Sequence, residues 1–220
     1  SLIGRLAVVR KAEDRIFSSN FMAVSLINLT MMSAYYMLMV TITSYSLNDL
    51  KATHSMAGLI AGSMVLGLLA GRFVSGKLLS VLSFRNLLFL GIAEYLVFMG
   101  CYLLAKTPEQ LLIVRFLSGF GVGLVSTVTG TVVAYILPKD LMGTGISYYS
   151  LSTILATALG PFVGLLMMEY FPFTDMFLLC IGAGALSVLM VFGVRVTLPQ
   201  SFDSKAIARH GKGKKIASDE

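Results

Sequence analysis

Residues 16–48 read IFSSNFMAVSLINLTMMSAYYMLMVTITSYSLN, and this run contains no Asp, Glu, Lys or Arg. A helix needs roughly 20 predominantly apolar residues to cross a hydrocarbon core about 30 Å thick. The run is therefore long enough to cross a lipid bilayer as one helix. Strands of a membrane barrel are not expected, because they show short segments of alternating polarity and not one continuous apolar run.

The same pattern recurs along the rest of the chain. Runs without Asp, Glu, Lys or Arg occupy 52–71, 116–138, 141–168 and 176–194, and Glu94 alone interrupts a further run at 86–105. We predict an all-α integral membrane protein with six transmembrane helices. Their predicted ranges are 21–46, 56–79, 87–105, 111–137, 144–168 and 176–198, preceded by a segment at 1–20 and followed by one at 199–220.

The overall composition also argues against a soluble protein. Hydrophobic residues make up 56% of the chain and charged residues 13%, and the mean hydropathy is +0.84. A soluble domain carries roughly 25% charged residues and about 45–50% apolar ones. This chain has too little charge to cover a water-exposed surface, so we expect its outer face to contact lipid. Soluble enzymes, disordered regulators and extracellular disulfide scaffolds are not expected.

Lysine and arginine residues in the loops predict the orientation, because they are enriched in cytoplasmic loops. Six helices place both termini on one side of the membrane. The opposite loops hold only Lys51 and Lys106. The side of the termini holds Arg5, Arg10, Lys11, Arg15, Arg85, Lys139, Lys205, Arg209, Lys212, Lys214 and Lys215. We predict cytoplasmic termini and a location in the cytoplasmic (inner) membrane of a bacterium.

No nucleic-acid partner, metal or cofactor is predicted. The net charge of +6 reflects the topology, whereas nucleic-acid binding would require a folded basic face with base-reading groups. His54 and His210 lie on opposite sides of the membrane, and no CxxC or HExxH motif accompanies them. Cys101 and Cys180 lie within spans, where a buried apolar thiol is the simplest interpretation.

Three charged residues lie a full helical turn or more inside the predicted spans, and a central charge costs about 2.5–3.5 kcal/mol on insertion scales. Glu94 lies near the middle of the third helix, and Arg72 lies roughly 6 Å away in depth on the second helix, at a rise of 1.5 Å per residue. The two side chains form a structural ion pair if their helices are neighbours. Arg115 has no obvious partner at its depth, which favours a functional role.

Small residues spaced four positions apart predict close helix packing, because the hydrophobic effect does not drive helices together in lipid. They occur as Gly58-xxx-Gly62, Gly67-xxx-Gly71, Gly119-xxx-Gly123 and Ala156-xxx-Gly160-xxx-Gly164. Any single pair has an ordinary packing interpretation. Their concentration on the second, fourth and fifth helices predicts that these helices meet partners inside a compact bundle.

The loop between the second and third helices, residues 76–85, reads GKLLSVLSFR. It resembles the G-x-L-a-D-r-x-G-r-k motif of major facilitator superfamily transporters. Gly76, Leu78 and Arg85 match the motif, whereas Ser80 stands in place of its Asp and Ser83 in place of its second Gly. In the family the Asp helps to hold one closed conformation, so the resemblance carries a conformational role only to matching positions such as Gly76 and Arg85.

Residues 115–123 on the fourth helix read RFLSGFGVG. They resemble the R-x-x-q-G-x-g-a motif of the same family, with Ser118 in place of the usual Gln. The resemblance implies a part in proton coupling for Arg115 and a conformational part for Gly119 and Gly123. Glu94 is the second candidate for proton coupling, because it is the only carboxylate near the middle of a span.

Residues 156–165 on the fifth helix read ATALGPFVGL. They resemble the g-x-x-x-G-P-x-x-G-G signature of proton-coupled antiporters in the family, with departures at Ala156 and Leu165. The matching residues are Gly160, Pro161 and Gly164. Proline removes a backbone donor and kinks a helix, while the glycines permit close packing, so the resemblance implies an antiporter.

Together the three motifs imply one half of the major facilitator fold. Such transporters have two six-helix halves, each made of three-helix inverted repeats, and work by alternating access. We expect the N-terminal half, with a C-terminal six-helix half as partner and 199–220 as the start of the linker. The resemblance implies that the first and fourth helices line the substrate cavity, and each lining candidate alone also has an interpretation as a helix-packing group. The candidates are Asn28, Ser33, Tyr35, Tyr36, Thr43 and Ser118.

The predicted function is secondary active transport and not enzymatic catalysis. We expect proton-coupled efflux of a small amphipathic compound, with the compound, protons and the lipid bilayer as partners. Import of a metabolite by the same fold is the alternative, against which the Gly160-Pro161 segment argues. A six-helix channel or a membrane-embedded enzyme is the alternative from another class, but no selectivity-filter-like loop or nucleophile–base arrangement supports either.

Overall fold

The computed structural model describes residues 10–196. Its long helices are α2 (Ser19–Asn48), α3 (His54–Leu78), α4 (Phe84–Tyr102), α5 (Pro108–Ile136), α6 (Met142–Tyr170) and α7 (Phe173–Val191). A 3₁₀ turn at Lys139–Leu141 leads into α6, and residues 10–16 are also helical. Some predicted features lie outside the described residues, namely the linker at 199–220, Arg5, Lys205, Arg209, Lys212, Lys214 and Lys215.

Six of these helices are long and apolar enough to cross a membrane, which confirms the predicted number and order of spans. Four of them begin slightly before the predicted apolar runs, because a serine or threonine caps each one. The capping side chains, which accept a hydrogen bond from the backbone N–H three residues on, are Ser18, Thr53, Ser83 and Thr107. Ser83, which replaces a glycine of the family motif, therefore caps α4.

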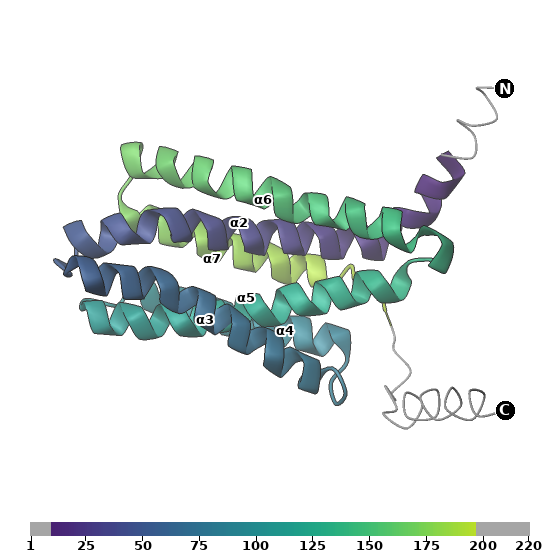
Figure 1. The fold of residues 1–220 in the computed structure, drawn as a ribbon, viewed down its shortest axis with the longest axis horizontal. Coiled ribbons are helices and arrows are strands. Elements are labelled where there is room, and N and C mark those ends of the chain that lie inside the picture. The colour runs from purple at the N-terminus through teal and green to yellow at the C-terminus, as the bar shows by residue number, and fades with distance from the viewer. Residues whose placement is uncertain (1–9, 197–220) are drawn as a thin grey trace, which may run out of the picture.

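The sixth span is shorter than predicted, because α7 ends at Val191 and not near residue 198. The chain then leaves the helix through a turn at residues 192–194. The backbone N–H of Arg195 donates to the Oδ1 atom of Asn20 over 2.7 Å. This hydrogen bond ties the end of the last span to the beginning of the first, so both lie at the same end of the bundle (Figure 1).

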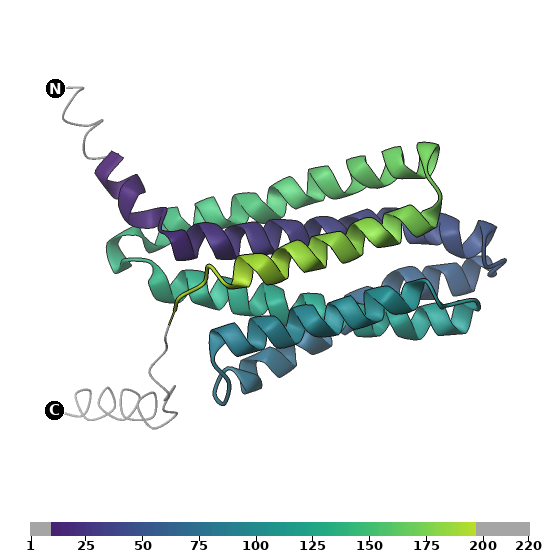
Figure 2. The same cartoon turned by 180° about the vertical axis from the view of Figure 1, so that it is seen from behind.

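The spans are arranged so that α5 packs against both α3 and α4, and α2 packs against both α6 and α7 (Figures 1 and 2). The helices α2 and α5 contact each other at the centre, and α4 contacts α7 on the face seen in Figure 2. In the first three spans, α3 and α4 thus pack on α5, which is the first helix of the second three. In the second three, α6 and α7 pack on α2, which is the first helix of the first three. This exchange is consistent with two interlocked three-helix repeats.

Glycines allow α3 and α5 to approach until their backbones touch. A Cβ atom added at Gly67 or Gly71 of α3 would overlap a backbone carbonyl of α5. Conversely, a Cβ atom added at Gly119 or Gly123 of α5 would overlap a backbone carbonyl of α3. The structure therefore confirms that both predicted glycine pairs lie at a helix contact.

The contact between α2 and α6 is built in the same way. A Cβ atom at Gly160 would lie 2.6 Å from the carbonyl oxygen of Ser33 and 2.9 Å from the backbone nitrogen of Met37. A Cβ atom at Gly164 would lie 3.0 Å from the Met37 side chain. The glycines of α6 therefore contact α2 as those of α3 contact α5, which is the similarity expected between the two repeats.

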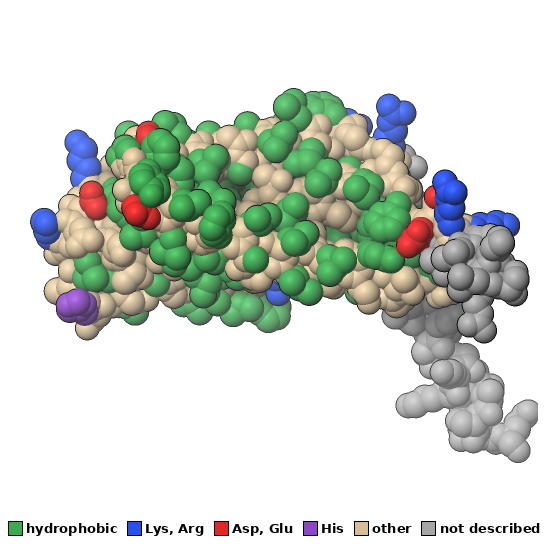
Figure 3. All heavy atoms as spheres, turned by 90° about the horizontal axis from the view of Figure 1, so that it is seen from above, with side chains coloured by type: hydrophobic (Ala, Val, Ile, Leu, Met, Phe, Trp, Pro, Cys, Tyr) green, Lys and Arg blue, Asp and Glu red, His purple; other side chains and the backbone are tan. Residues whose placement is uncertain are grey.

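The surface of the bundle matches a membrane environment. Charged side chains gather at its two ends, and the band between them is largely hydrophobic (Figure 3). Large apolar side chains such as Leu59, Phe73, Val97 and Leu189 are more than half exposed. Such a band fits the hydrocarbon of a bilayer, because a continuous apolar surface of this size is unfavourable in water.

Residues 10–17 pack against the beginning of α6 and the turn before it. The guanidinium of Arg15 forms a two-pronged ion pair with Asp140, with distances of 2.9 and 3.1 Å. The ring of Phe17 meets the ring of Tyr148 edge-on, with 5.0 Å between centroids. This part of the predicted N-terminal segment therefore contacts the bundle.

Candidate functional site

Polar side chains buried between the helices are the candidates for function, since each needs a partner where water is absent. Some bond only to a carbonyl one turn back in their own helix, as Ser46 and Ser187 do. Others join different helices, and these are the stronger candidates. Within residues 10–196 there is no group of three His, Cys, Asp or Glu side chains suited to a metal ion.

Arg115 lies on α5 at the contact with α3 and is fully buried. Its Nε atom lies 3.3 Å from the carbonyl oxygen of Ile60, and its Nη2 atom lies 3.4 Å from that of Ala61. Its Nη1 atom lies 2.9 Å from the sulfur of Met64. A carbonyl oxygen has two lone pairs and accepts a second bond beside its helical one. No carboxylate within the described residues pairs with Arg115, so groups of α3 solvate its charge.

Ser118 lies one turn after Arg115 and faces α4. The hydroxyl of Tyr102, a fully buried side chain, lies 3.0 Å from the Oγ atom of Ser118. Ser118 in turn donates to the carbonyl oxygen of Arg115 over 3.0 Å, so Tyr102 is the donor to Ser118. The structure corrects the prediction that Ser118 lines a cavity, because its hydroxyl is fully buried and engaged between α4 and α5.

Glu94 lies on α4 at its contact with α5. Its Oε2 atom is buried and has no hydrogen-bond partner among the described residues. The residue opposite is Gly121 of α5, where an added Cβ atom would overlap this oxygen. The carboxyl group of Glu94 therefore occupies the space that any larger side chain at position 121 would fill.

The predicted ion pair between Arg72 and Glu94 is wrong. Arg72 is exposed on α3, whereas Glu94 faces α5, and α5 packs between α3 and α4. In the described part of the chain, Arg15 and Asp140 form the single ion pair. The sequence predicts how deep each residue lies in the membrane, but it does not predict the direction in which each side chain leaves its helix.

Two further polar contacts hold α6 in place. The Nδ2 atom of Asn28 on α2 donates to the hydroxyls of Ser152 and Thr153, over 2.8 and 2.9 Å. The hydroxyl of Tyr149 lies 2.8 Å from the Oγ1 atom of Thr129 on α5. Asn28 was expected to line a cavity, but its exposure of 2% and its two bonds make it a helix-packing group.

The other predicted cavity residues of α2 do not gather in one place. Tyr35 is buried, and its ring meets that of the half-buried Tyr36 edge-on with 5.1 Å between centroids. Thr43 is half-buried two turns further along the helix. Ser33 lies on the wall of a separate pocket. The six candidates therefore do not form a single site within this half.

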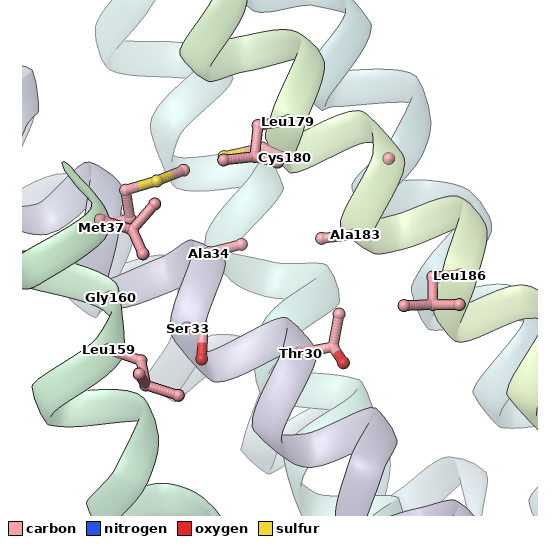
Figure 4. A pocket seen from close by; sticks show the side chains of 12 residues that line it. Thr30, Ser33, Ala34, Met37, Leu159, Gly160, Leu179, Cys180, Ala183 and Leu186 are labelled. Carbon is pink, nitrogen blue, oxygen red and sulfur yellow. The ribbon is translucent and has the colours of Figure 1, made fainter. Parts of the chain in front are cut away.

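The pocket beside Ser33 lies between α2, α6 and α7 and has a volume of about 390 Å³ (Figure 4). Its walls are mainly apolar, with Leu159 and Gly160 from α6 and Ala183 from α7. The hydroxyls of Thr30 and Ser33 lie on its α2 side (Figure 4). The close approach of α6 to α2 at Gly160 thus borders this cavity.

A second cavity of about 810 Å³ is an apolar groove between α3 and α5. Gly58 and Gly62 line it together with Leu66, Ile113 and Phe116. A Cβ atom added at either glycine would have no neighbour within 4 Å. The prediction that Gly58 and Gly62 pack against another helix of this bundle is therefore wrong.

Two positions that match the family motif, Gly76 near the end of α3 and Arg85 at the start of α4, differ in their surroundings. The guanidinium carbon of Arg85 lies 5.9 Å from the ring centre of Phe89 and 5.5 Å from that of Phe192. Such cation–π contacts join the beginning of α4 to the end of α7. Gly76 has no neighbour within 4 Å of an added Cβ atom, so packing within this half does not require a glycine there.

Pro161 lies inside α6, which continues from Met142 to Tyr170. Because proline has no N–H, the carbonyl of Thr157 lacks its usual helical partner. The neighbouring Gly160 touches the backbone of α2. The weakest point of the α6 backbone therefore lies at the α2–α6 contact.

Sequence reasoning missed three residues that join helices here: Tyr102, Tyr149 and Gly121. A phenolic hydroxyl deep within a span is a usable signal, since it needs a partner in an apolar environment. Gly121 stands between Gly119 and Gly123, but it faces α4 and they face α3. Only the helix arrangement separates their roles.

Comparison with known proteins adds a family and a relative. The model of the Major Facilitator Superfamily matches residues 24–218. The probable drug/proton antiporter YHK8 of Saccharomyces cerevisiae is 30% identical to this chain over 136 residues. The alignment covers 61% of this chain and 26% of that relative, so the chain spans about a quarter of the relative's length.

Proposed function

The chain belongs to the Major Facilitator Superfamily, and we propose that it forms the N-terminal half of a transporter that exports a small amphipathic compound in exchange for protons. Transport follows from the family, while the direction, the compound and the coupling ion are the proposal. The name of the yeast relative, a probable drug/proton antiporter, supports this choice. So does the Gly160-Pro161 segment, which lies where α6 meets α2.

The observation that carries the proposal is the placement of Arg115 and Glu94 at two different helix contacts of α5. Arg115 of α5 lies at the contact with α3, and Glu94 of α4 lies at the contact between α4 and α5. Within the described residues neither has an oppositely charged partner. An unpaired carboxyl in an apolar site is favoured in its neutral form, so Glu94 is suited to carry a proton. Arg115 is suited to sense a change of charge or of helix position through α5.

The substrate site is proposed to lie between this half and the C-terminal half, with contributions from both. Tyr35, Tyr36 and Thr43 are the proposed contributions of α2. Asn28 and Ser118 are not, because the structure engages them between helices. Rocking of the two halves would then expose the site alternately to the two sides of the membrane.

Both termini of the chain are proposed to face the cytoplasm of the cell, with the protein in the plasma membrane. The end at which α2 begins carries most of the basic side chains outside the spans, and the opposite loops carry few. The residues are Arg10, Lys11, Arg15, Arg85 and Lys139 at the first end, and Lys51 and Lys106 at the other. A bacterial source stays a prediction.

Transport assays on the full-length protein in proteoliposomes test the proposal. The vesicle lumen is made acidic, and a pH-sensitive dye is enclosed in it. Addition of a transported amphipathic compound outside should then move protons out of the lumen, and the dye reports the rise in the luminal pH. Arg115→Ala should abolish this exchange, and Arg115→Lys should restore only part of it, because lysine lacks the planar fork of donors. Lys106→Ala, which changes an exposed loop residue, is the matched control.

Two outcomes would contradict the proposal. Coupled exchange that survives Arg115→Ala would remove Arg115 from the mechanism. Accumulation of the compound on the side predicted to be cytoplasmic, driven by the natural gradient, would favour import by the same fold.

A further inference from the structure

The contact between α4 and α5 holds a carboxyl group at mid-membrane depth. Glu94 and Gly121 lie near the middle of their helices. The Oε2 atom of Glu94 is buried against Gly121 and has no hydrogen-bond partner within residues 10–196, while the outward neighbours Ala93 and Val97 are exposed on the outer face of α4. The carboxyl therefore lies at the border between the helix contact and the bilayer.

The backbones of α4 and α5 approach each other at the same level. A Cβ atom at Gly121 would lie 2.8 Å from the carbonyl oxygen of Gly91 as well as overlapping the Glu94 carboxyl. A Cβ atom at Gly91 would lie 2.9 Å from the Val125 side chain, and the three atoms nearest to it do not include the Glu94 carboxyl. The two glycines thus share one helix crossing, but only Gly121 makes room for the carboxyl.

We propose that Glu94 and Gly121 form a protonation-gated contact in which the neutral carboxyl fits against Gly121 and loss of its proton loosens α4 from α5. Gly121 is the positioning residue. Because no side chain of residues 10–196 donates to the buried Oε2 atom, a charged carboxylate at this place would be poorly solvated, so it would leave the contact or draw water into it. The inference rests on the proposed function only in assigning this step to proton-coupled transport.

No other titratable group on the packed elements competes for Glu94. The helices that pack on α4 are α5 and α7. Arg115 is bonded to α3, and the hydroxyl of Tyr95 is 3.1 Å from the carbonyl oxygen of Cys180. None of the charged or titratable residues of α4, α5 and α7 bonds to the Glu94 carboxyl in the described structure. They are Arg85, Tyr95, Cys101, Tyr102, Glu109, Arg115, Tyr135, Asp175 and Cys180.

The gate would act on the rest of the bundle through α5. Gly119 and Gly123 fix the other face of α5 to the backbone of α3. A change at the α4 contact therefore reaches the α3 contact within one helical turn, without a chain of intermediate side chains. The proton site would in this way be separate from the substrate cavity between the halves.

Chemical labelling of the full-length protein in lipid nanodiscs tests the gate. The probe is N,N′-dicyclohexylcarbodiimide, a lipid-soluble reagent that modifies protonated carboxyl groups, and mass spectrometry of peptides locates the product. Glu94 should be modified at acidic pH and lose its modification as the pH rises. Over the same pH range, hydrogen exchange of the α4 backbone should become faster. Glu94→Gln should remove both the modification and the pH dependence of exchange.

Paired substitutions separate positioning from packing. Gly121→Ala should displace the carboxyl, shift the pH profile of α4 exchange and change the labelling, and the shorter carboxyl of Glu94→Asp should reverse these changes in the double variant. Gly91→Ala is the matched control, because it crowds the same crossing without touching the carboxyl. If Gly121→Ala does not fold, the comparison of Glu94→Gln with Glu94→Asp still decides whether the titration of this residue controls α4.

Three results would overturn the inference. The first is no carbodiimide product at Glu94 at any pH, and the second is a hydrogen-exchange rate of α4 that stays constant over the pH range in which Glu94 loses its modification. The third is the same pH profile of α4 exchange in Gly91→Ala and Gly121→Ala. None of these measurements uses a gradient or a transported compound. A gate that titrates as expected in a protein without proton-coupled exchange would support this inference and contradict the proposed function.

Discussion

Replacing Gly160 by alanine should weaken the contact between α2 and α6 and should slow transport. The new Cβ atom would lie 2.6 Å from the carbonyl oxygen of Ser33 and 2.9 Å from the backbone nitrogen of Met37. Close C···O contacts in proteins lie at about 3.3–3.6 Å. The helices must therefore move apart by about 0.7 Å at this level, or α6 must bend, because the opposing atoms belong to a backbone and cannot rotate away.

The expected loss of stability is the difference between two effects. Overpacking of a close contact costs about 1–3 kcal/mol, and alanine gains about 0.5–1 kcal/mol over glycine inside a helix. The net decrease in the free energy of unfolding should be about 0.5–2 kcal/mol. Pro161 directly follows Gly160 and already removes one backbone hydrogen bond, so we expect α6 to bend at this place in preference to moving as a rigid rod.

Gly62→Ala is the matched control, since a Cβ atom there has no neighbour within 4 Å. Equilibrium unfolding of the full-length protein in mixed detergent micelles gives both free energies, and vesicle transport gives the rates. Gly62→Ala should leave the free energy of unfolding unchanged or raise it by up to about 1 kcal/mol. Equal free energies for the two variants would refute the reasoning that the backbone contact at Gly160 is tight.

The remaining predictions concern polar and charged residues within the spans. Arg72→Ala and Glu94→Ala should change stability additively within about 0.3–0.5 kcal/mol in a double-mutant cycle, because the two side chains do not touch; a larger coupling energy would restore the ion pair. Tyr102→Phe removes one buried hydroxyl and should lower the free energy of unfolding by about 0.5–1.5 kcal/mol, and Ser118→Ala added to it should cost little more, since the Tyr102–Ser118 bond is then already lost. Asn28→Ala removes the donor shared by Ser152 and Thr153, so faster hydrogen exchange should appear in α6 and not in α4; the reverse pattern would contradict the assignment of Asn28 to the α2–α6 contact.

The helices of this fold could be predicted because lipid imposes one simple rule, a long apolar run for each crossing. The beginnings of the helices depend on different chemistry. Ser18, Thr53, Ser83 and Thr107 fix where four helices begin, because each caps free N–H groups of the first turn, and each precedes the predicted span. Hydropathy does not register a cap, so the predicted starts fell after the observed ones.

The candidate site was less predictable, because it depends on the direction of side chains and not on their depth. Arg115 could be recognised as a costly charge within a span, but backbone carbonyls such as that of Ile60 occur in every helix and carry no sequence signal. Gly58 and Gly67 both begin a four-residue glycine spacing on α3, yet only Gly67 meets another backbone. Only the three-dimensional arrangement of the helices shows which neighbour each face of α3 contacts.

One segment of α5 contacts helices on both of its sides, and this arrangement limits how the half can move. Arg115, Gly119 and Gly123 recur every four residues and face α3, as the helical period requires. Ser118 and Gly121 lie between them and face α4. Because backbone atoms touch on both sides, α5 cannot shift along one neighbour without shifting along the other. In the proposed mechanism, a proton taken up at Glu94 would therefore be linked mechanically to a movement of α3 at Arg115, although the two side chains lie at different contacts of α5.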